Sequence, residues 1–192
     1  MDSKFVLELI LKFVETKTIN EKLQSIEYIN SINGKQIYDW EKWLQIEFAI
    51  FLFDEASLAD WGREKRYLLD GRKKDRIKFK KTTTVDFWIK RKYQKKPGEI
   101  LIEFKRARSI NGCISKMIKD GSLLRRIKKS NSEVRSFWMI GFHPSENERH
   151  NVNNKAYKHE GNLKEGIKWS TMETKRIENT ELSLSIFTLN EE

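Results

Sequence analysis

Large apolar residues recur every three or four positions in the first third of the chain, a spacing that places them on one face of a helix. They predict helices over residues 3–17, 20–30 and 40–59. The third is the most strongly apolar, and Asp39 is its candidate N-cap. Glu47 falls inside its apolar stripe, four residues after Trp43 and four before Phe51. A carboxylate there needs a cationic or hydrogen-bonding partner, which is either structural or part of a functional site.

After residue 63 the apolar period shortens to two, as in strands with one buried face. The strands that it predicts cover residues 64–69, 82–90 and 99–106. A helix over residues 111–129 follows, and residues 135–142 form a nearly continuous apolar run that suits a buried central strand. A three-strand meander, a crossover helix and a fourth strand predict a mixed α/β sheet with helices packed on it. Residues 182–189 alternate like a terminal edge strand.

A chain of 192 residues has room for one domain of ordinary size. We expect an N-terminal helical extension over residues 1–38, a core over 39–145, and a C-terminal loop and strand extension over 146–192 packed on the same domain. No apolar run reaches 18 residues, so no membrane span is expected. The first residues carry acids and lack a cleavage site, unlike a signal peptide, and the single Cys113 fits a reducing, cytoplasmic setting.

The net charge of +10 is concentrated in one segment. Residues 63–129 hold 24 Lys or Arg against seven Asp or Glu, whereas the rest of the chain is net acidic. Clustered cations favour phosphate backbones through counterion release. A basic surface that only aids solubility is the plainer alternative. An acidic membrane surface fits less well, because the basic residues are spread over strands, loops and a helix instead of along one amphipathic face.

Two of the predicted strands carry acids on their less apolar face. Glu103 and Lys105 project to the same side of the strand over residues 99–106, and Asp86 lies on the corresponding face of the preceding strand. The opposite, more apolar faces are made of Ile100, Ile102 and Phe104 on one strand and Val85, Phe87 and Ile89 on the other.

If Lys90 and Glu99 close the hairpin between these strands, continuing the pairing places Asp86 opposite Glu103. Directly opposed side chains have Cβ atoms about 5 Å apart. Two carboxylates at that distance repel each other unless a cation lies between them, and a divalent metal with oxygen ligands answers this need. In contrast, His143, His150 and His159 with the one cysteine fit no compact zinc pattern.

The order helix, three strands, helix, strand carries Glu47 on its first helix, Asp86 on its second strand and Glu103-Phe104-Lys105 on its third. This arrangement resembles the PD-(D/E)xK nuclease superfamily over roughly residues 40–143. Val85 stands where that family often has a proline. The resemblance implies an α/β fold with a restriction endonuclease-like αβββαβ core, a central mixed β-sheet flanked by helices, and an N-terminal helical extension.

The resemblance also implies roles for these residues. Asp86, Glu103 and the main-chain carbonyl of Phe104 would hold Mg²⁺, for which Mn²⁺ can substitute, and Glu47 would complete the site through water or a second metal. Lys105 would orient the attacking water or help to deprotonate it, and would stabilise the transition state.

The implied activity is that of an endonuclease on double-stranded DNA. The alternatives are a structure-selective recombination, repair or transposition nuclease, and a non-catalytic DNA-binding subunit. With one site per chain, a homodimer and a heteromeric nuclease complex are both open. The residues expected to contact nucleic acid are Lys73, Lys74, Lys80, Lys81, Arg91, Lys92, Lys95, Lys96, Arg106, Arg108, Lys116, Arg125 and Arg126.

Overall fold

The computed structural model describes residues 2–32, 35, 37, 39–69, 81–93, 97–127, 133–145 and 167–191, with only the backbone of residues 167–172 and 189–191. Within these residues the chain forms four helices and six strands. The helices are α1 (Asp2–Val14), α2 (Lys17–Ser31), α3 (Trp40–Phe53) and α4 (Ile110–Leu124). The strands are β1 (Leu58–Leu68), β2 (Thr82–Arg91), β3 (Glu99–Arg106), β4 (Val134–Pro144), β5 (Ile167–Arg176) and β6 (Leu182–Glu191).

The strands form one mixed sheet in the order β1-β2-β3-β4-β6-β5. β3 and β4 are parallel and are joined by α4, which confirms the predicted crossover, and all other neighbours are antiparallel. β4 lies inside the sheet, as its apolar sequence predicts. The prediction of an edge strand at the C-terminus is wrong. β6 lies between β4 and β5, because β5, whose sequence is largely polar, pairs along its outer side.

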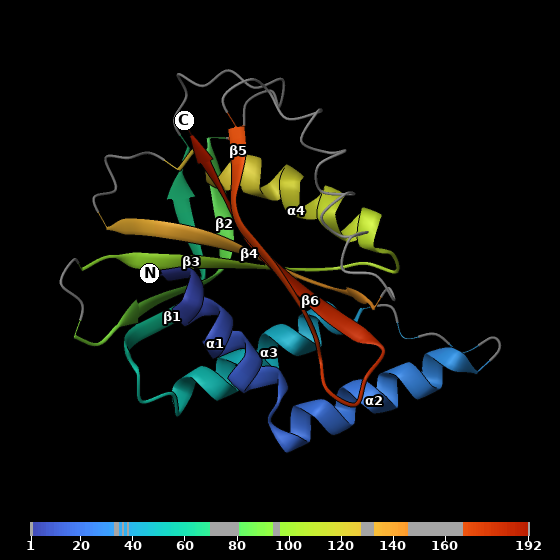
Figure 1. Ribbon diagram of the computed structural model, residues 1–192. Helices are drawn as coiled ribbons and strands as arrows, with labels where there is room; N and C mark the ends of the chain where they lie inside the picture. Colours follow the sequence, from blue (N-terminus) through green and yellow to red (C-terminus); the bar gives the residue numbers. More distant parts are fainter. Residues whose placement is uncertain are drawn as a thin grey trace.

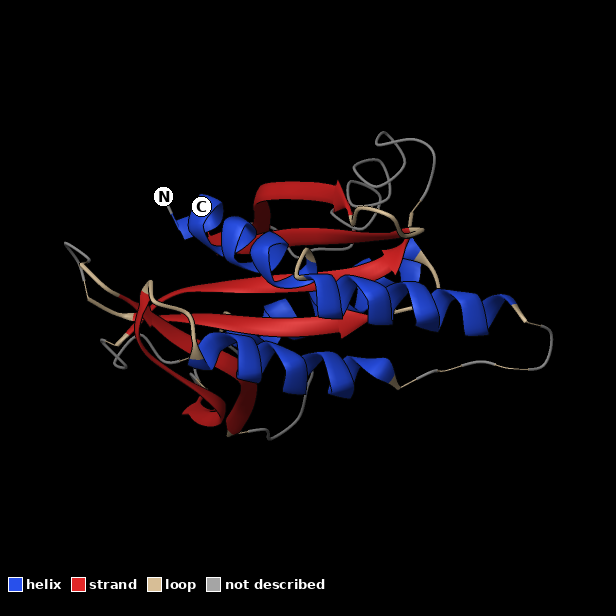
Figure 2. Ribbon diagram, turned by 90° about the horizontal axis from the view of Figure 1, so that it is seen from below, coloured by secondary structure: helices blue, strands red, loops and turns tan. Residues whose placement is uncertain are grey.

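Helices cover both faces of the sheet, with α4 on one side and α1, α2 and α3 on the other (Figure 1). Figure 2 looks from the side of α1, α2 and α3 and shows helices in front of the strands of the sheet. On this face the rings of Phe13, Phe48, Phe87 and Phe104 form the centre of the larger hydrophobic core. Residues of α1 and β6 belong to the same core as those of α3 and the central strands. No helix in the described ranges is long and apolar enough to cross a membrane.

The helix α3 ends at Phe53, six residues before the predicted end, and β1 starts correspondingly early at Leu58. A turn separates the two elements. The N–H of Leu58 donates to the carbonyl of Glu55, and the N–H of Ser57 donates to Oε1 of Glu55 at 3.0 Å. This side chain and its neighbouring polar residues stop the helix, so the apolar residues after Phe53 belong to a strand.

Candidate active site

The hairpin of β2 and β3 has the predicted register, with Ile89 opposite Ile100, Trp88 opposite Leu101 and Phe87 opposite Ile102. The backbone pairing stops there, one position before Asp86 and Glu103. The pairing with β1 is interrupted at the same place, because it passes from Phe87 directly to Val85. The opening in the sheet therefore lies at Asp86.

One prediction about the faces of β2 is wrong as a result of this interruption. Val85 was expected to share a face with Phe87 and Ile89, but it packs in the core beneath α4, while the other two pack in the core beneath α3. Glu64 of β1, which would stand opposite Asp86, has a φ of 52°. This left-handed backbone breaks the regular alternation between the strands.

At the opening, side chains replace the missing backbone ladder. Oδ2 of Asp86 accepts a hydrogen bond from the N–H of Phe104 at 2.8 Å, and Oε2 of Glu103 accepts one from the N–H of Asp86 at 3.2 Å. Each strand thus carries a carboxylate that reaches the backbone of the other. The structure brings Asp86 and Glu103 together, as the register predicted.

Both carboxyl groups are destabilised in their charged form. Burial raises the pKa of Glu103 to about 7, and the nearby charge of Asp86 contributes to the rise. Burial also raises the pKa of Asp86, against the hydrogen bond from Phe104 and the positive charge of Lys105. A half-buried and a buried acid with raised pKa values on adjacent strands have the electrostatics of a cation site or of an acid–base site.

Lys105 lies on the same side of β3 and joins the pair to α4. Its ammonium is 2.8 Å from Oε1 of Glu103 and 3.0 Å from Oδ2 of Asp120. Burial would lower the pKa of Lys105, but the charges of Glu103, Asp120 and Asp86 outweigh it and raise the pKa above its ordinary value. Lys105 is therefore a fixed cation in this site and not a neutral base.

Asp120 was missed in the sequence, although a signal was present. It lies three residues after Met117 and four before Leu124, so it falls inside the inward stripe of α4. The same kind of signal drew attention to Glu47. An acid on the inward face of a crossover helix has a partner on the sheet below, and that partner is Lys105.

The carboxylate that α3 contributes is Glu41 and not Glu47. Oε2 of Glu41 accepts a hydrogen bond from the N–H of Arg106 at 2.7 Å, at the end of β3. Burial raises the pKa of Glu41, the charge of Lys105 opposes the rise, and the charge of Asp86 adds to it. Glu41 is therefore within electrostatic reach of both residues.

The structure places Glu47 in a different environment. Its Oε1 accepts hydrogen bonds from Nζ of Lys22 at 2.6 Å and from Nε1 of Trp43 at 2.9 Å. The bond from Lys22 lowers the pKa of Glu47, so the carboxylate is fully charged and paired. The prediction that Glu47 belongs to the site is corrected by this contact with α2, which is the structural role left open in the sequence.

A pocket of about 550 Å³ adjoins Glu41 and carries several of the predicted phosphate-binding cations. Arg106, Arg108 and Lys116 line it together with Lys42, Asp39 and Ala107. Nζ of Lys116 donates to the carbonyl of Arg106 at 3.0 Å, and the guanidinium of Arg106 lies 5.3 Å from the ring of Trp40. Three predicted contacts, from β3, α4 and the connection between them, therefore meet in one hollow beside Glu41.

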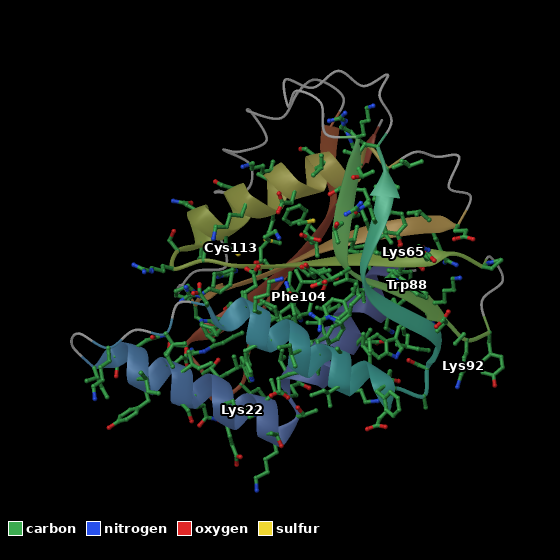
Figure 3. The ribbon with its side chains drawn as sticks, turned by 180° about the vertical axis from the view of Figure 1, so that it is seen from behind. Lys22, Lys65, Trp88, Lys92, Phe104 and Cys113 are labelled. Carbon is green, nitrogen blue, oxygen red and sulfur yellow. The ribbon has the colours of Figure 1, made fainter. Side chains whose placement is uncertain are left out.

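The other predicted nucleic-acid contacts are more scattered. Lys81 and Lys92 are exposed at the two ends of β2, and Arg91 stacks 4.0 Å from the ring of Phe5. In Figure 3, Lys92 and Cys113 lie on opposite sides of the molecule. Lys73, Lys74, Lys80, Lys95 and Lys96 lie outside the described residues, as do His150 and His159.

Arg125 and Arg126 were expected on the outer side of a helix that ran to residue 129. The helix ends at Leu124, so helical spacing does not apply to them. Arg125 is partly buried, and Arg126 is only 6% exposed, next to Ile127, which bridges to Leu69 of the chain before β2. The prediction that Arg126 lies on an open surface is wrong.

Within the described residues, no three Asp, Glu, His or Cys side chains form a group that could hold a metal ion. The arrangement present is a close carboxylate pair with a lysine, and Glu41 of α3 lies at the end of β3, where it bonds the N–H of Arg106. His143 is fully buried, and its Nε2 is 2.8 Å from Oγ of Ser185, so it serves the packing of β4 against β6.

Comparison of the chain with protein-family models, with curated proteins and with solved structures finds no match.

Proposed function

We propose that this chain is a magnesium-dependent nuclease that hydrolyses phosphodiester bonds in DNA, with Asp86, Glu103 and Lys105 at its active site. The observation that carries the proposal is the opening in the sheet, where the partly buried carboxylate of Asp86 and the buried carboxylate of Glu103 lie close together and a fixed ammonium stands beside Glu103. A structural ion pair between Lys105 and Glu103 alone would not need Asp86 as a second acid whose pKa is raised.

The residues present fit a divalent cation with oxygen ligands. Mg²⁺ in proteins is bound through one or two carboxylates, with water and substrate phosphate as the remaining ligands. Asp86 and Glu103 supply two carboxylates. The carbonyl of Phe104 is directed to the same opening, because the N–H and C=O of one residue in a strand point to the same side and this N–H reaches Asp86. A cation between the two acids would also relieve the repulsion that raises the pKa of Glu103.

Each side chain then has a defined task. Bound Mg²⁺ would lower the pKa of a water and neutralise charge that develops on the phosphate. Asp86 and Glu103 hold their oxygens at the opening through the bonds to Phe104 and Asp86 backbone groups. Lys105, fixed by Glu103 and Asp120, directs its positive charge at the place where the negative charge of the transition state develops.

Glu41 and the adjoining basic pocket complete the proposed site. Glu41 would contact the cation through water, the role that the motif's resemblance assigned to Glu47. The phosphate that follows or precedes the scissile bond would lie in the pocket lined by Arg106, Arg108 and Lys116. The six-stranded mixed sheet with helices on both faces is compatible with a restriction endonuclease-like core, and we propose that arrangement together with the activity.

The test is incubation of the purified protein with supercoiled plasmid, linear duplex, branched DNA and RNA, in Mg²⁺ or in EDTA. We expect DNA cleavage in Mg²⁺ alone, and a loss of at least about a thousandfold in Asp86→Asn and Lys105→Ala. Asp60→Asn on the exposed part of β1 is the matched control and should cleave like the wild type.

A second readout separates metal binding from cleavage. Mg²⁺ or Mn²⁺ without DNA should raise the melting temperature of the wild type but not that of Asp86→Asn, because a ligand that binds only the folded state stabilises it. Cleavage by Asp86→Asn at the wild-type rate would exclude the proposed site. DNA binding without cleavage by the wild type would favour a non-catalytic subunit.

A further inference from the structure

The outward face of α3 carries a row of large apolar side chains. Ile46, Ile50 and Phe53 are 51%, 60% and 80% exposed, and they follow one another at helical spacing. The inward face of the same helix, with Leu44, Phe48 and Leu52, is already buried against the sheet. In Figure 3, α3 is the blue-green helix between α2 and β1, with the sheet behind it.

A helix that is apolar on opposite sides is normally covered on both. A surface helix with one core face needs polar residues outward, and α1 and α2 follow this rule with Lys4, Glu8, Lys17 and Glu21 in exposed ion pairs. On α3 the row of Ile46, Ile50 and Phe53 departs from it. Contiguous exposed apolar side chains of this kind mark an interaction surface.

The two ends of this row carry opposite charges. Exposed Lys42, which also lines the pocket beside Glu41, lies one turn before Ile46, and exposed Asp54 lies one turn after Ile50. A two-fold axis that passes beside position 48 therefore relates Ile46 to Ile50 and Lys42 to Asp54. Two copies of α3 packed antiparallel in this way place apolar side chains against apolar ones and each lysine against an aspartate.

We propose that this surface binds a second copy of the chain, with the two α3 helices antiparallel around a two-fold axis. An isologous interface requires a patch that is complementary to itself, and this row meets the requirement in both its apolar and its charged positions. Antiparallel helices pack with their axes about 8–10 Å apart, a distance at which Ile46 and Ile50 of facing helices interdigitate.

The surface beside the row of Ile46, Ile50 and Phe53 also suits such an interface. A hollow of about 430 Å³ lies next to Ile50, and it is lined by Phe13, Ile19 and Phe51 from the core and by Asp54 and Glu55 at its rim. Glu55 at this rim is paired with Lys12 at 2.7 Å, so Asp54 is the acid to which Lys42 of the second copy is directed. The inference does not depend on the nuclease proposal, because assembly is measured without DNA or metal.

Sedimentation velocity over a range of protein concentrations tests the interface. We expect a weak wild-type dimer whose population rises with protein concentration, because three apolar side chains on each copy make a small interface. Ile50→Glu should weaken the dimer by about a hundredfold, because it buries two charges near the axis. The matched control is Tyr28→Glu on α2, where the tyrosine is 70% exposed. This substitution should leave the dimer unchanged.

Exchange of charges tests the antiparallel register. Lys42→Asp and Asp54→Lys should each weaken the dimer by about tenfold or more, because each creates two like-charge contacts. An equimolar mixture of the two variants should form a heterodimer, visible by native mass spectrometry, since both contacts then join opposite charges. The variant that carries both exchanges should dimerise like the wild type.

Several outcomes would overturn the proposal. They are a wild type that is monomeric at every concentration, a dimer that Ile50→Glu leaves intact, and a mixture of the charge variants that does not pair. Circular dichroism of each variant shows whether it is folded, and the exposed positions of all four substitutions favour an unchanged fold.

Discussion

Glu41 and Glu47 lie six residues apart on α3, and their carboxylates have different neighbours. Six residues correspond to one and two-thirds turns, so the two side chains leave the helix in different directions. Glu41 bonds the end of β3, while Glu47 bonds Lys22 of α2. The apolar stripe drew attention to Glu47, but a stripe shows only that a polar residue needs a partner. Which element supplies the partner depends on how the helix crosses the sheet.

This difference gives a matched pair of substitutions. If the proposed nuclease activity is correct, Glu41→Gln should lower kcat/KM for Mg²⁺-dependent cleavage by about 10–100-fold, because the α3 carboxylate acts on the cation site. Glu47→Gln should stay within about twofold of the wild type and cost less than about 1 kcal/mol of stability, since its ion pair is partly exposed. Steady-state cleavage and urea unfolding of both variants decide the question. The reverse ranking of the activities would restore Glu47 to the site.

Glu103 makes the stability of the metal-free protein depend on pH. The pKa of Glu103 is raised to about 7 by burial and by Asp86. Between the ordinary pKa of a glutamate and about pH 7, the folded protein therefore keeps a proton on Glu103 that the unfolded chain has lost. The free energy of unfolding therefore falls as the pH rises through this window. We expect Glu103→Gln to remove much of this fall, and to be more stable than the wild type above pH 7 by on the order of 1–3 kcal/mol.

Urea unfolding in EDTA across this pH range measures the effect, with far-UV circular dichroism as the signal. Mg²⁺ should restore stability to the wild type above pH 7 and should act weakly on Glu103→Gln. Parallel pH profiles for the two proteins in EDTA would show that Glu103 is not the group responsible.

At the scale of elements, the hairpin of β2 and β3 was predictable and the ends of α3 and α4 were not. Alternation over residues 82–90 and 99–106 defined both strands, and the observed register followed from closing the loop between them. The end of α3 depends on one turn at Glu55 and Ser57. Apolar residues continue on both sides of this turn, so the apolar pattern alone does not show where the helix ends. The sequence of β5 has no clear apolar period and did not predict a strand. This segment becomes a strand because it pairs with β6.

The contact between α4 and β4 gives a prediction at this scale. A Cβ at Gly141 would overlap Sδ of Met117 and would lie 2.7 Å from Sγ of Cys113. Gly141→Ala should therefore destabilise the protein by about 1–3 kcal/mol through overpacking. Met117→Ala makes room for the new methyl group, so the double variant should lose clearly less than the two single losses together. Additive losses in urea unfolding would place the strain elsewhere.

At the scale of the whole molecule, the chain combines one shared core with a strongly uneven charge. Residues of α1, α3, the central strands and β6 pack together in the larger core, so the two ends of the chain hold the middle in place. The basic segment over residues 63–129 includes β2, β3 and α4, the elements that carry the candidate site. Sequence could locate this charge, but only the fold shows that Arg106, Arg108 and Lys116 line one pocket.

This charge predicts how the binding of DNA depends on salt. A protein that neutralises several phosphates releases counterions, and the logarithm of its affinity falls linearly with the logarithm of the salt concentration. We expect a steep slope for a duplex in EDTA, where cleavage is prevented, and a slope smaller by about 1 in Arg108→Ala. Lys17→Ala, an exposed lysine of α2 outside the basic segment, should keep the wild-type slope. Fluorescence anisotropy titrations at several salt concentrations measure all three. Equal slopes for the two variants would mean that the net charge attracts DNA without a phosphate in the pocket, whereas the predicted difference would place a phosphate beside Arg108, in the pocket that Glu41 also lines.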